Sequence, residues 1–343
     1  MRTSVLAAVF LLSACSSGPN TSERASASPS VVPSVPARSG LEVRLVGAGP
    51  VLEASKLDAK IAVLPGAFII DEGTYRAYLV GFGAERGDQQ GYYATSQDGV
   101  TWVLTDTDPL AELGLDPFPP GPIPYSVLVE ADGSWTMYLW GVTDPSGFRA
   151  SIWRATAPGP RGPWIADPEP VLRGDAEGWD SLGVDSPSVV RTADGYLMAF
   201  VGATVEDRNT AHIGVATSPD GITWTKHDGP VIFPGLCGDF DDRSVTQPRL
   251  LRRSGAGYLL LYSGNGLTRN DAAIGVATSA DGVAWTCAPT SPILDRPDVP
   301  GSDGIHTIAL ATTDDEAQLL IESLIGGNGS SELWLADLVS TLP

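Results

Sequence analysis

A strand–turn–strand motif occurs twice in the chain in nearly identical form and constrains the fold more than any other feature. Residues 213–224 read IGVATSPDGITW, and residues 274–285 read IGVATSADGVAW. An earlier copy at 92–102 reads YYATSQDGVTW. Asp-Gly between runs of β-branched and aromatic residues is the strongest short-range hairpin signal. Repetition of such units predicts a propeller, because one blade cannot bury its faces alone. The repeated turns are expected to be structural.

Residues 185–230 form one complete unit, in which turn residues separate four short apolar runs. This pattern predicts a four-stranded antiparallel blade. Five inner strands are expected, and they begin near Gly66, Tyr125, Pro187, Pro248 and Thr307. The sequence therefore predicts an all-β fold, a single five-bladed β-propeller of four-stranded antiparallel blades.

The last blade contains three recognisable strands, TIALAT, AQLLIES and SELWLADL, before the sequence ends. Residues 41–52, LEVRLVGAGPVL, end like the outer strands of other blades. We predict that this segment supplies the missing strand by pairing with residues 333–338. The propeller then spans residues 41–343, and its first and last blades share no exposed edge.

The N-terminal region has the composition of an export signal. Arg2 precedes a short apolar run at 5–12, and Leu-Ser-Ala-Cys follows. The run is too short to span a bilayer. Its end resembles the lipobox of bacterial lipoproteins, which implies a signal peptide at 1–14 and a lipidated Cys15; the alternative is an ordinary secretory signal with an incidental cysteine. Residues 15–40 are rich in Ser, Pro and Ala and predict a flexible tether. We expect an extracytoplasmic protein that is lipid-anchored to a bacterial membrane.

Composition narrows the ligand class and the redox state. The net charge is −20 with a pI near 4.3, so nucleic acids and anionic lipid surfaces are poor ligands for the folded part. A neutral glycan fits better, and we expect a monomer that contacts the membrane through its lipid anchor alone. Because export leads to an oxidising compartment, we predict a disulfide between Cys237 and Cys287.

Two charged residue types recur ahead of the strands. Three Asp residues each lie seven places before an inner-strand proline: Asp58, Asp180 and Asp241. Three Arg residues each lie six places before a residue of the third strand: Arg86, Arg208 and Arg269. The Asp residues are interpreted as caps that order their loops. The Arg residues either bridge to these Asp residues or contact ligand hydroxyls.

Other positions break the repeat and are the candidates for a site. We call the face that holds the starts of the inner strands the top face. There the blades are predicted to place Val63, Ile123, Asp185, Thr246 and His306 around the central channel. Asp185 is either a general acid with a shifted pKa or a cap on its Ser-Pro turn. His306 is either a hydrogen-bonded channel histidine or a ligand to a metal or water.

Glu322 is the third break in the repeat. It is predicted to occupy a second-strand place that is apolar in the other blades, where Ala77, Met137, Met198 and Leu260 stand. A lone Glu in such a place requires a partner, for which an Arg is expected.

The segments GWDSLGVDSPSVVRTADGYLMAF, IGVATSPDGITWTK and GYLLLYSG resemble the five-bladed propeller superfamily of arabinanases, β-xylosidases, invertases and levansucrases, particularly its family 43-like members. The resemblance covers residues 41–343. It implies a catalytic carboxylate on each of the first three blades, with the acid two residues before a proline, as in Asp185-Ser186-Pro187. Where the resemblance implies an Asp-Pro pair on the first blade, this chain has Leu64-Pro65, which leaves Asp58 as the candidate base. Where it implies an Asp on the second blade, this chain has Ile123-Pro124, and Asp116 lies slightly upstream.

The resemblance implies a glycoside hydrolase, with Asp185 as acid and Asp58 as base, acting on an arabinofuranoside or a xyloside. The alternative is a non-catalytic glycan-binding propeller that has lost its base. The expected ligand contacts are Arg208, Arg269, His306, Asp180 and Asp241. No cofactor is expected, with a Ca²⁺ ion in the central channel as the alternative.

Overall fold

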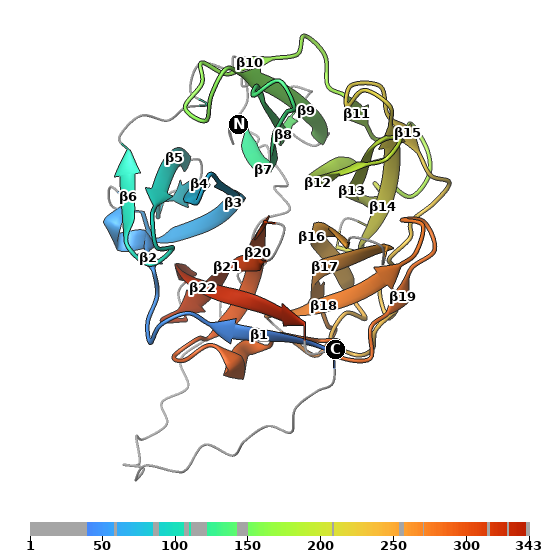
Figure 1. Ribbon diagram of the computed structural model, residues 1–343. Helices are drawn as coiled ribbons and strands as arrows, with labels where there is room; N and C mark the ends of the chain where they lie inside the picture. Colours follow the sequence, from blue (N-terminus) through green and yellow to red (C-terminus); the bar gives the residue numbers. More distant parts are fainter. Residues whose placement is uncertain are drawn as a thin grey trace, which may run out of the picture.

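The chain folds into a ring of five antiparallel blades around a central axis (Figure 1), and single bridges join blade 2 to blade 3 and blade 4 to blade 5. The computed structural model describes residues 40–57, 60–84, 89–105, 110, 122–142, 150–207, 209–253, 257–269, 271–313, 316–327 and 329–340. Each blade has its first strand next to the axis and the following strands outward. The prediction of an all-β, five-bladed propeller is therefore confirmed.

The first three blades follow one another directly in sequence. Blade 1 contains β3 (Ala62–Asp71), β4 (Thr74–Phe82), β5 (Gln89–Ser96) and β6 (Trp102–Thr105). Blade 2 contains β7 (Ile123–Val129), β8 (Trp135–Val142) and β9 (Ala150–Ala157), with an outer strand in two pieces, β10 (Ile165–Ala166) and β11 (Leu172–Arg173). Blade 3 contains β12 (Gly183–Thr192), β13 (Gly195–Ala203), β14 (Ala211–Ser218) and β15 (Thr225–Lys226).

The last two blades complete the ring. Blade 4 contains β16 (Ser244–Arg253), β17 (Gly257–Asn265), β18 (Ala272–Ser279) and β19 (Thr286–Cys287). Blade 5 contains β20 (Gly304–Thr312), β21 (Ala317–Ile325) and β22 (Ser330–Ser340), and its outer strand is β1 (Leu41–Leu45) with β2 (Leu52–Glu53).

The N-terminal segment closes the ring as predicted. β1 pairs with β22 in antiparallel register from Leu41 opposite Ser340 to Leu45 opposite Ala336. β2 continues the same edge, with Leu52 opposite Leu333. Figure 1 shows the blue β1 beside the red β22. The first strand of the propeller is therefore part of its last blade, where it pairs with β22.

The repeated Asp-Gly turns are built identically. In blade 3, Asp220 Oδ1 accepts hydrogen bonds from the backbone N–H groups of Ile222 and Thr223, and Trp224 Nε1 donates to the Gly221 carbonyl. The same contacts recur around Asp98 and Asp281. The backbone hydrogen bonds lower the pKa of Asp98 and Asp220 to about 2. These turns satisfy their own polar groups, which supports the structural role predicted for them.

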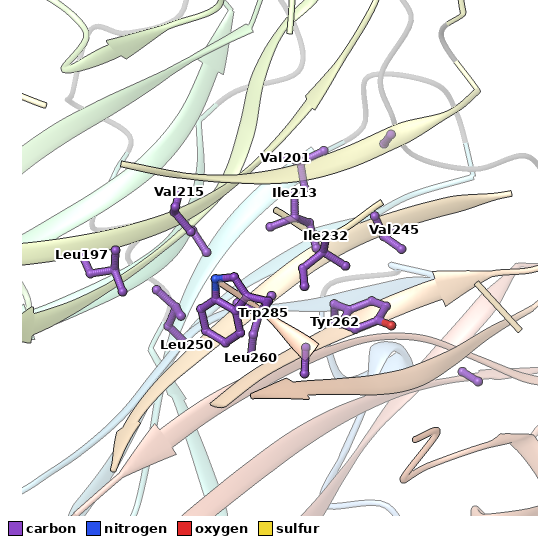
Figure 2. Close-up of a cluster of buried hydrophobic side chains, with 14 of the residues drawn as sticks. Leu197, Val201, Ile213, Val215, Ile232, Val245, Leu250, Leu260, Tyr262 and Trp285 are labelled. Carbon is purple, nitrogen blue, oxygen red and sulfur yellow. The ribbon is translucent and has the colours of Figure 1, made fainter. Parts of the chain in front are cut away.

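Neighbouring blades pack through large apolar side chains. Figure 2 shows the interface of blades 3 and 4, where Ile213 and Val215 of β14 face Leu260 and Tyr262 of β17. Tyr262 and Ile213 are fully buried, and Trp285 lies beside Leu250 and Leu260 in the same cluster. Side chains of this size each contribute roughly 1.5–3 kcal/mol when buried. The blades are therefore held together mainly by hydrophobic contact between their faces.

A β-bulge interrupts every inner strand at the same height. The pairing register shifts between these residues: Pro65 and Ala67, Pro124 and Ser126, Asp185 and Ser188, Thr246 and Arg249, and Ile305 and Ile308. Ser186 and Gln247 lie in these bulges with φ of 52° and 53°. Non-glycine residues adopt such angles rarely, and bulges often re-aim side chains next to functional sites. All five bulges lie on the channel-lining strands.

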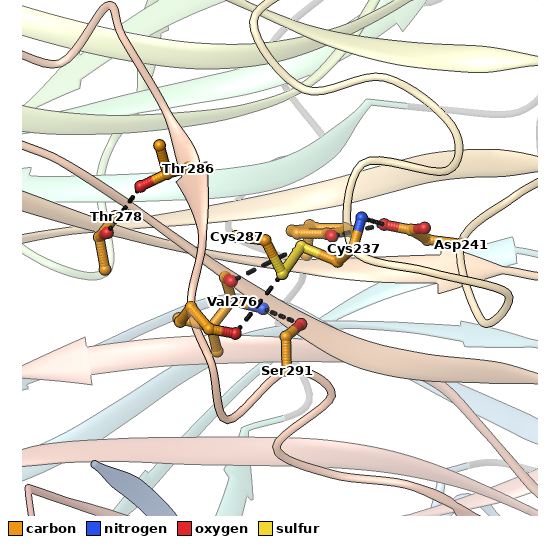
Figure 3. The surroundings of a disulfide bond; sticks show 9 residues. Cys237, Asp241, Val276, Thr278, Thr286, Cys287 and Ser291 are labelled. Carbon is orange, nitrogen blue, oxygen red and sulfur yellow. Dashed lines mark hydrogen bonds between the residues drawn. A yellow bond between two sulfur atoms is a disulfide. The ribbon is translucent and has the colours of Figure 1, made fainter.

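Cys237 and Cys287 form a disulfide, with their Cα atoms 5.3 Å apart (Figure 3). Cys287 lies in the outer strand β19 of blade 4, whereas Cys237 lies in the connection that leads from blade 3 into β16. Its backbone N–H donates to Asp241 Oδ2 at 3.2 Å. The disulfide therefore links the connection between blades 3 and 4 to the outer strand of blade 4.

We predict that the Cys237→Ser/Cys287→Ser double variant unfolds at lower denaturant concentration than the wild type. The disulfide closes a loop with a sequence separation of 50, for which chain entropy gives a stabilisation of up to about 4 kcal/mol. Urea unfolding followed by tryptophan fluorescence measures this difference. Equal midpoints would show that the disulfide does not contribute to stability.

Candidate functional site

The pairing register identifies which residues occupy equivalent places at the top of the inner strands. Each of these places pairs with a second-strand residue at the same distance from the hairpin that joins the first two strands. Those second-strand residues are Val80, Trp140, Val201, Ser263 and Ser323. The residues that occupy them are Leu64, Ile123, Asp185, Thr246 and Ile305. We call these five the top ring. Asp185 is its only ionisable member.

Two of the predicted ring positions were wrong by one residue. Leu64, and not Val63, lies in the ring, because the blade 1 bulge leaves Pro65 paired to β4. In blade 5, Ile305 occupies the ring, and His306 lies in the bulge itself. No proline marks the bulge of blade 5, so the sequence carries no local signal for its register.

Asp185 is half-buried at the top of β12. Its Oδ1 accepts hydrogen bonds from the backbone N–H and the hydroxyl of Ser186. Among the described residues, none donates a hydrogen bond to its Oδ2. Burial raises the pKa of Asp185 to about 6, although the Ser186 hydrogen bonds and the positive charge of Arg249 act in the opposite direction. The carboxyl group can therefore hold or release a proton close to neutral pH.

Apolar side chains occupy the other two places where the resemblance implies catalytic carboxylates. Leu64 and Ile123 are each only 1% exposed and belong to one hydrophobic cluster with Val80 and Trp140. They form an apolar wall next to Asp185 in the ring. Burial against such a wall favours the neutral form of a carboxyl group. The top ring can thus supply one proton donor but no second carboxylate.

Arg249 lies below the top ring and reaches across the channel. It is only 3% exposed. Its Nε donates to the Ile308 carbonyl at 2.6 Å, and its terminal nitrogens donate to the carbonyls of Tyr125 at 3.4 Å and Gly66 at 3.3 Å. Burial lowers the pKa of Arg249 to about 10, so the group stays charged at neutral pH. One side chain of blade 4 therefore contacts blades 1, 2 and 5.

Tyr125, in the blade 2 bulge, connects the acid to this arginine. The guanidinium carbon of Arg249 lies 5.4 Å from the centre of its ring. Gln247 Nε2 donates to its hydroxyl at 3.5 Å. Burial and the charge of Asp185 raise the pKa of Tyr125, and its hydrogen bonds do not offset this increase. Tyr125 therefore stays a neutral hydroxyl beside Asp185.

His306 and Glu322 form a partly buried pair in blade 5, with Nδ1 and Oε2 2.8 Å apart. The Glu322 side chain is 4% exposed and that of His306 is 26% exposed. The predicted partner of Glu322 was an arginine, but it is this histidine. Glu322 also lies two places further along β21 than predicted, where the other blades have Leu79, Leu139, Phe200 and Tyr262. Burial lowers the pKa of His306, but Glu322 raises it by more, so the net shift is upward.

Asp180 and Asp241 are both fully buried and bind the protein itself. Asp180 accepts from Lys226 Nζ at 2.7 Å and from the backbone N–H of Asp175. Asp241 accepts from the Tyr262 hydroxyl at 2.6 Å and from Cys237. These contacts order the loops ahead of blades 3 and 4. We therefore leave both residues out of the ligand site.

Arg269 binds carboxylates other than the one expected. Its two terminal nitrogens contact Asp295 at 3.0 and 2.5 Å, and Asp271 lies at 3.1 Å. The expected bridge to Asp241 is therefore wrong for this blade. Asp58, Arg86, Asp116 and Arg208 lie outside the described residues, as does Cys15.

The donor set of the channel does not fit the Ca²⁺ ion considered as an alternative. Calcium requires several oxygen ligands, usually including carboxylates. Here the carbonyls of Gly66, Tyr125 and Ile308 accept hydrogen bonds from Arg249, which already carries a positive charge. Within the described part of the chain, no group of three or more His, Cys, Asp or Glu residues could hold a metal ion.

Sequence reasoning did not single out Arg249. The signal was present, because the register-equivalent residues of the other blades are Ala67, Ser126, Ser188 and Ile308. One long cationic residue in a ring of mostly small side chains has room to cross the channel. Its partners are 59 to 183 residues away in sequence, so no local pattern identifies them.

No family model and no curated protein matches the chain. Solved structures do match it. A structure from the GH130 family of mannoside phosphorylases shares 20% identity, with 90% of this chain and 95% of that chain covered and a TM-score of 0.63. A thermostable family-43 glycoside hydrolase shares 19% identity, with 83% and 91% covered and a TM-score of 0.61. An N-acetylgalactosamine deacetylase from F. plautii shares 14% identity, with 87% and 95% covered and a TM-score of 0.60.

The chain therefore has the fold of the five-bladed propeller glycoside hydrolases. This agrees with the resemblance found in the sequence. The same fold carries phosphorylases, hydrolases and a deacetylase, so it does not by itself fix a reaction. The reaction has to be argued from the site.

We predict that Asp185→Asn stabilises the protein at pH 8. A carboxyl group whose folded pKa is raised to about 6 contributes stability below its unfolded pKa of about 4, and loses it as pH rises through 6. The full effect is at most about 3 kcal/mol. Asn does not ionise, so the variant and the wild type should differ at pH 8 and converge near pH 4. Urea unfolding across this range measures the difference; a variant less stable than wild type at pH 8 would indicate the capping role instead.

Proposed function

We propose that this protein is a glycoside hydrolase-like protein that acts on a glycan at the top mouth of its channel, with Asp185 as general acid. The observation that carries this proposal is the top ring, in which a single carboxyl group with a raised pKa faces an otherwise uncharged set of residues. The fold, which is shared with glycan-acting enzymes, supports the same conclusion.

The proposed chemistry assigns the proton to Asp185 Oδ2. Ser186 hydrogen bonds to Oδ1 and leaves Oδ2 to reach a glycosidic oxygen. Protonation of that oxygen allows the C–O bond to break and the alcohol to leave. Hydrolysis also requires a second carboxylate across the bond, as a base or a nucleophile. We propose Asp58 for this role, since Leu64 and Ile123 cannot supply it, and an arabinofuranoside or a xyloside as the substrate.

The second candidate function is glycan binding without turnover. Leu64 and Ile123 favour it, because they replace two carboxylates that the hydrolytic mechanism of the resembling enzymes uses. In this case Asp185 accepts hydrogen bonds from sugar hydroxyls, with His306 and Arg208 as further contacts. Both candidates place the glycan at the same mouth and differ only in whether a bond is cleaved.

Asp185→Asn is expected to abolish cleavage of glycosides with poor leaving groups while retaining more activity on activated aryl glycosides, since a good leaving group needs little protonation. A loss on the order of 10²-fold or more is expected for the former. Turnover of arabinofuranosides and xylosides at pH 5–8 provides the measurement, with Asp194→Asn, an exposed hairpin residue, as the matched control.

The outcomes distinguish the two candidates. If the wild type binds a glycan in an array but cleaves none of the tested glycosides, glycan binding replaces hydrolysis. If Asp185→Asn cleaves poor substrates as fast as the wild type does, Asp185 is not the acid.

We further propose that the protein is held outside the cell membrane by acyl groups on Cys15. The lipobox-like segment supports this proposal, and the predicted tether would separate the anchor from the propeller. No helix among the described residues is long and apolar enough to cross a membrane. In a bacterial host, Cys15→Ala is expected to move the protein from the detergent phase to the aqueous phase on phase partitioning or to block its maturation. Unchanged partitioning of the variant would contradict the proposal.

A further inference from the structure

Direct contacts between neighbouring inner strands come from the residues just below the bulges. Ser126 Oγ accepts from the Val189 backbone N–H at 3.1 Å, and so links blade 2 to blade 3. Ser188 Oγ accepts from the Leu250 backbone N–H at 2.8 Å, and so links blade 3 to blade 4. At the equivalent place of blade 4, Arg249 continues this series by donating to Ile308 in blade 5.

Arg249 differs from the two serines because it also reaches blades 1 and 2. Its contacts at Gly66 and Tyr125 are carbonyl groups of the bulges themselves. Gly66 allows the inner strands of blades 1 and 2 to lie close together there, because a Cβ atom on it would lie 2.5 Å from the Pro124 carbonyl oxygen. The guanidinium thus donates to a carbonyl group in the bulge of blade 1 and to one in the bulge of blade 2.

The charge of Arg249 acts on Asp185 in blade 3, the blade that its hydrogen bonds do not reach. Among the described residues, Arg249 on β16 is the charged group that shifts the pKa of Asp185, and Asp185 in turn raises the pKa of Tyr125 on β7. Arg249 favours the ionised form of Asp185, and Asp185 in turn favours the charged form of Arg249. A buried cation with neutral carbonyl partners benefits from such a neighbour.

We propose that Arg249 is a positioning residue of the Asp185 site: its guanidinium takes the place of a channel metal ion, holds the inner strands of blades 1, 2 and 5 in register, and keeps a fixed positive charge beside the acid. The catalytic part of this proposal rests on the proposed function, whereas the structural and electrostatic parts do not.

Two variants separate the charge from the hydrogen bonds. Arg249→Gln removes the charge but keeps amide donors, and Arg249→Lys keeps the charge but loses the planar fork. Arg252→Gln, an exposed arginine on the same strand, is the control. The Asp185 pKa is followed by ¹³C-carboxyl NMR titration, with the signal assigned by its loss in Asp185→Asn, so no turnover is needed.

Arg249→Gln is expected to raise the Asp185 pKa by on the order of one unit, since a nearby opposite charge favours the carboxylate. Arg249→Lys should leave that pKa close to the wild-type value. Both should lower Tm by roughly 5 °C or more, whereas Arg252→Gln should change neither quantity. The Tm of the wild type should not respond to EDTA or Ca²⁺.

A folded Arg249→Gln variant with wild-type Tm and wild-type Asp185 titration would overturn the proposal. If that variant does not fold while Arg249→Lys and Arg252→Gln do, the structural part is supported. Arg249→Lys then tests the electrostatic part, and an Asp185 pKa that moves up in this variant would overturn it. If the protein is an active hydrolase, the alkaline limb of its pH–rate profile, where the general acid loses its proton, should shift with the titration; absence of turnover would count against the proposed function alone.

Discussion

The structure depends on how five sheets that share an axis are held at their inner edges. Hydrophobic contact joins the blade faces, but it is not directional and does not fix the height of one blade against the next. Hydrogen bonds between inner strands fix this height, and they are made by Ser126, Ser188 and Arg249. Arg249 links more blades than either serine does, because its donors reach three other blades. The cost of burying its charge is offset by hydrogen bonds to three carbonyl groups and by the charge of Asp185.

This arrangement separates the scaffold from the site. The Asp-Gly turns repeat with the same contacts in three blades, and they lie at the opposite end of the blades from Asp185. The top ring carries the variation, with Leu64 and Ile123 buried on one side of Asp185 and Thr246 on the other. A single acid in an apolar ring is suited to donating one proton or to accepting one hydroxyl group, and the second reactive group has to come from outside the ring.

Much of the fold could be predicted from the sequence, because strands and hairpin turns are encoded locally. The repeated turns gave the blades, and the similarity of residues 41–52 to other outer strands gave the closure onto β22. The bulges were harder: without a proline, the register of blade 5 could not be counted, and His306 was placed one residue too high. The pairing of His306 with Glu322 and the contacts of Arg249 arise only when distant strands meet at the axis. Asp185 was found because it breaks a repeat, and Arg249 was missed although it breaks one too.

The central claim is that Asp185 Oδ2 meets the reacting oxygen of a glycan at the top mouth. A crystal structure of Asp185→Asn with a bound arabino- or xylo-oligosaccharide tests this claim most directly. The account predicts a glycosidic oxygen within about 3 Å of the substituted side chain, above the bulges and in contact with the top ring. An oligosaccharide bound elsewhere on the propeller, with residue 185 beyond hydrogen-bond reach of the sugar, would contradict it.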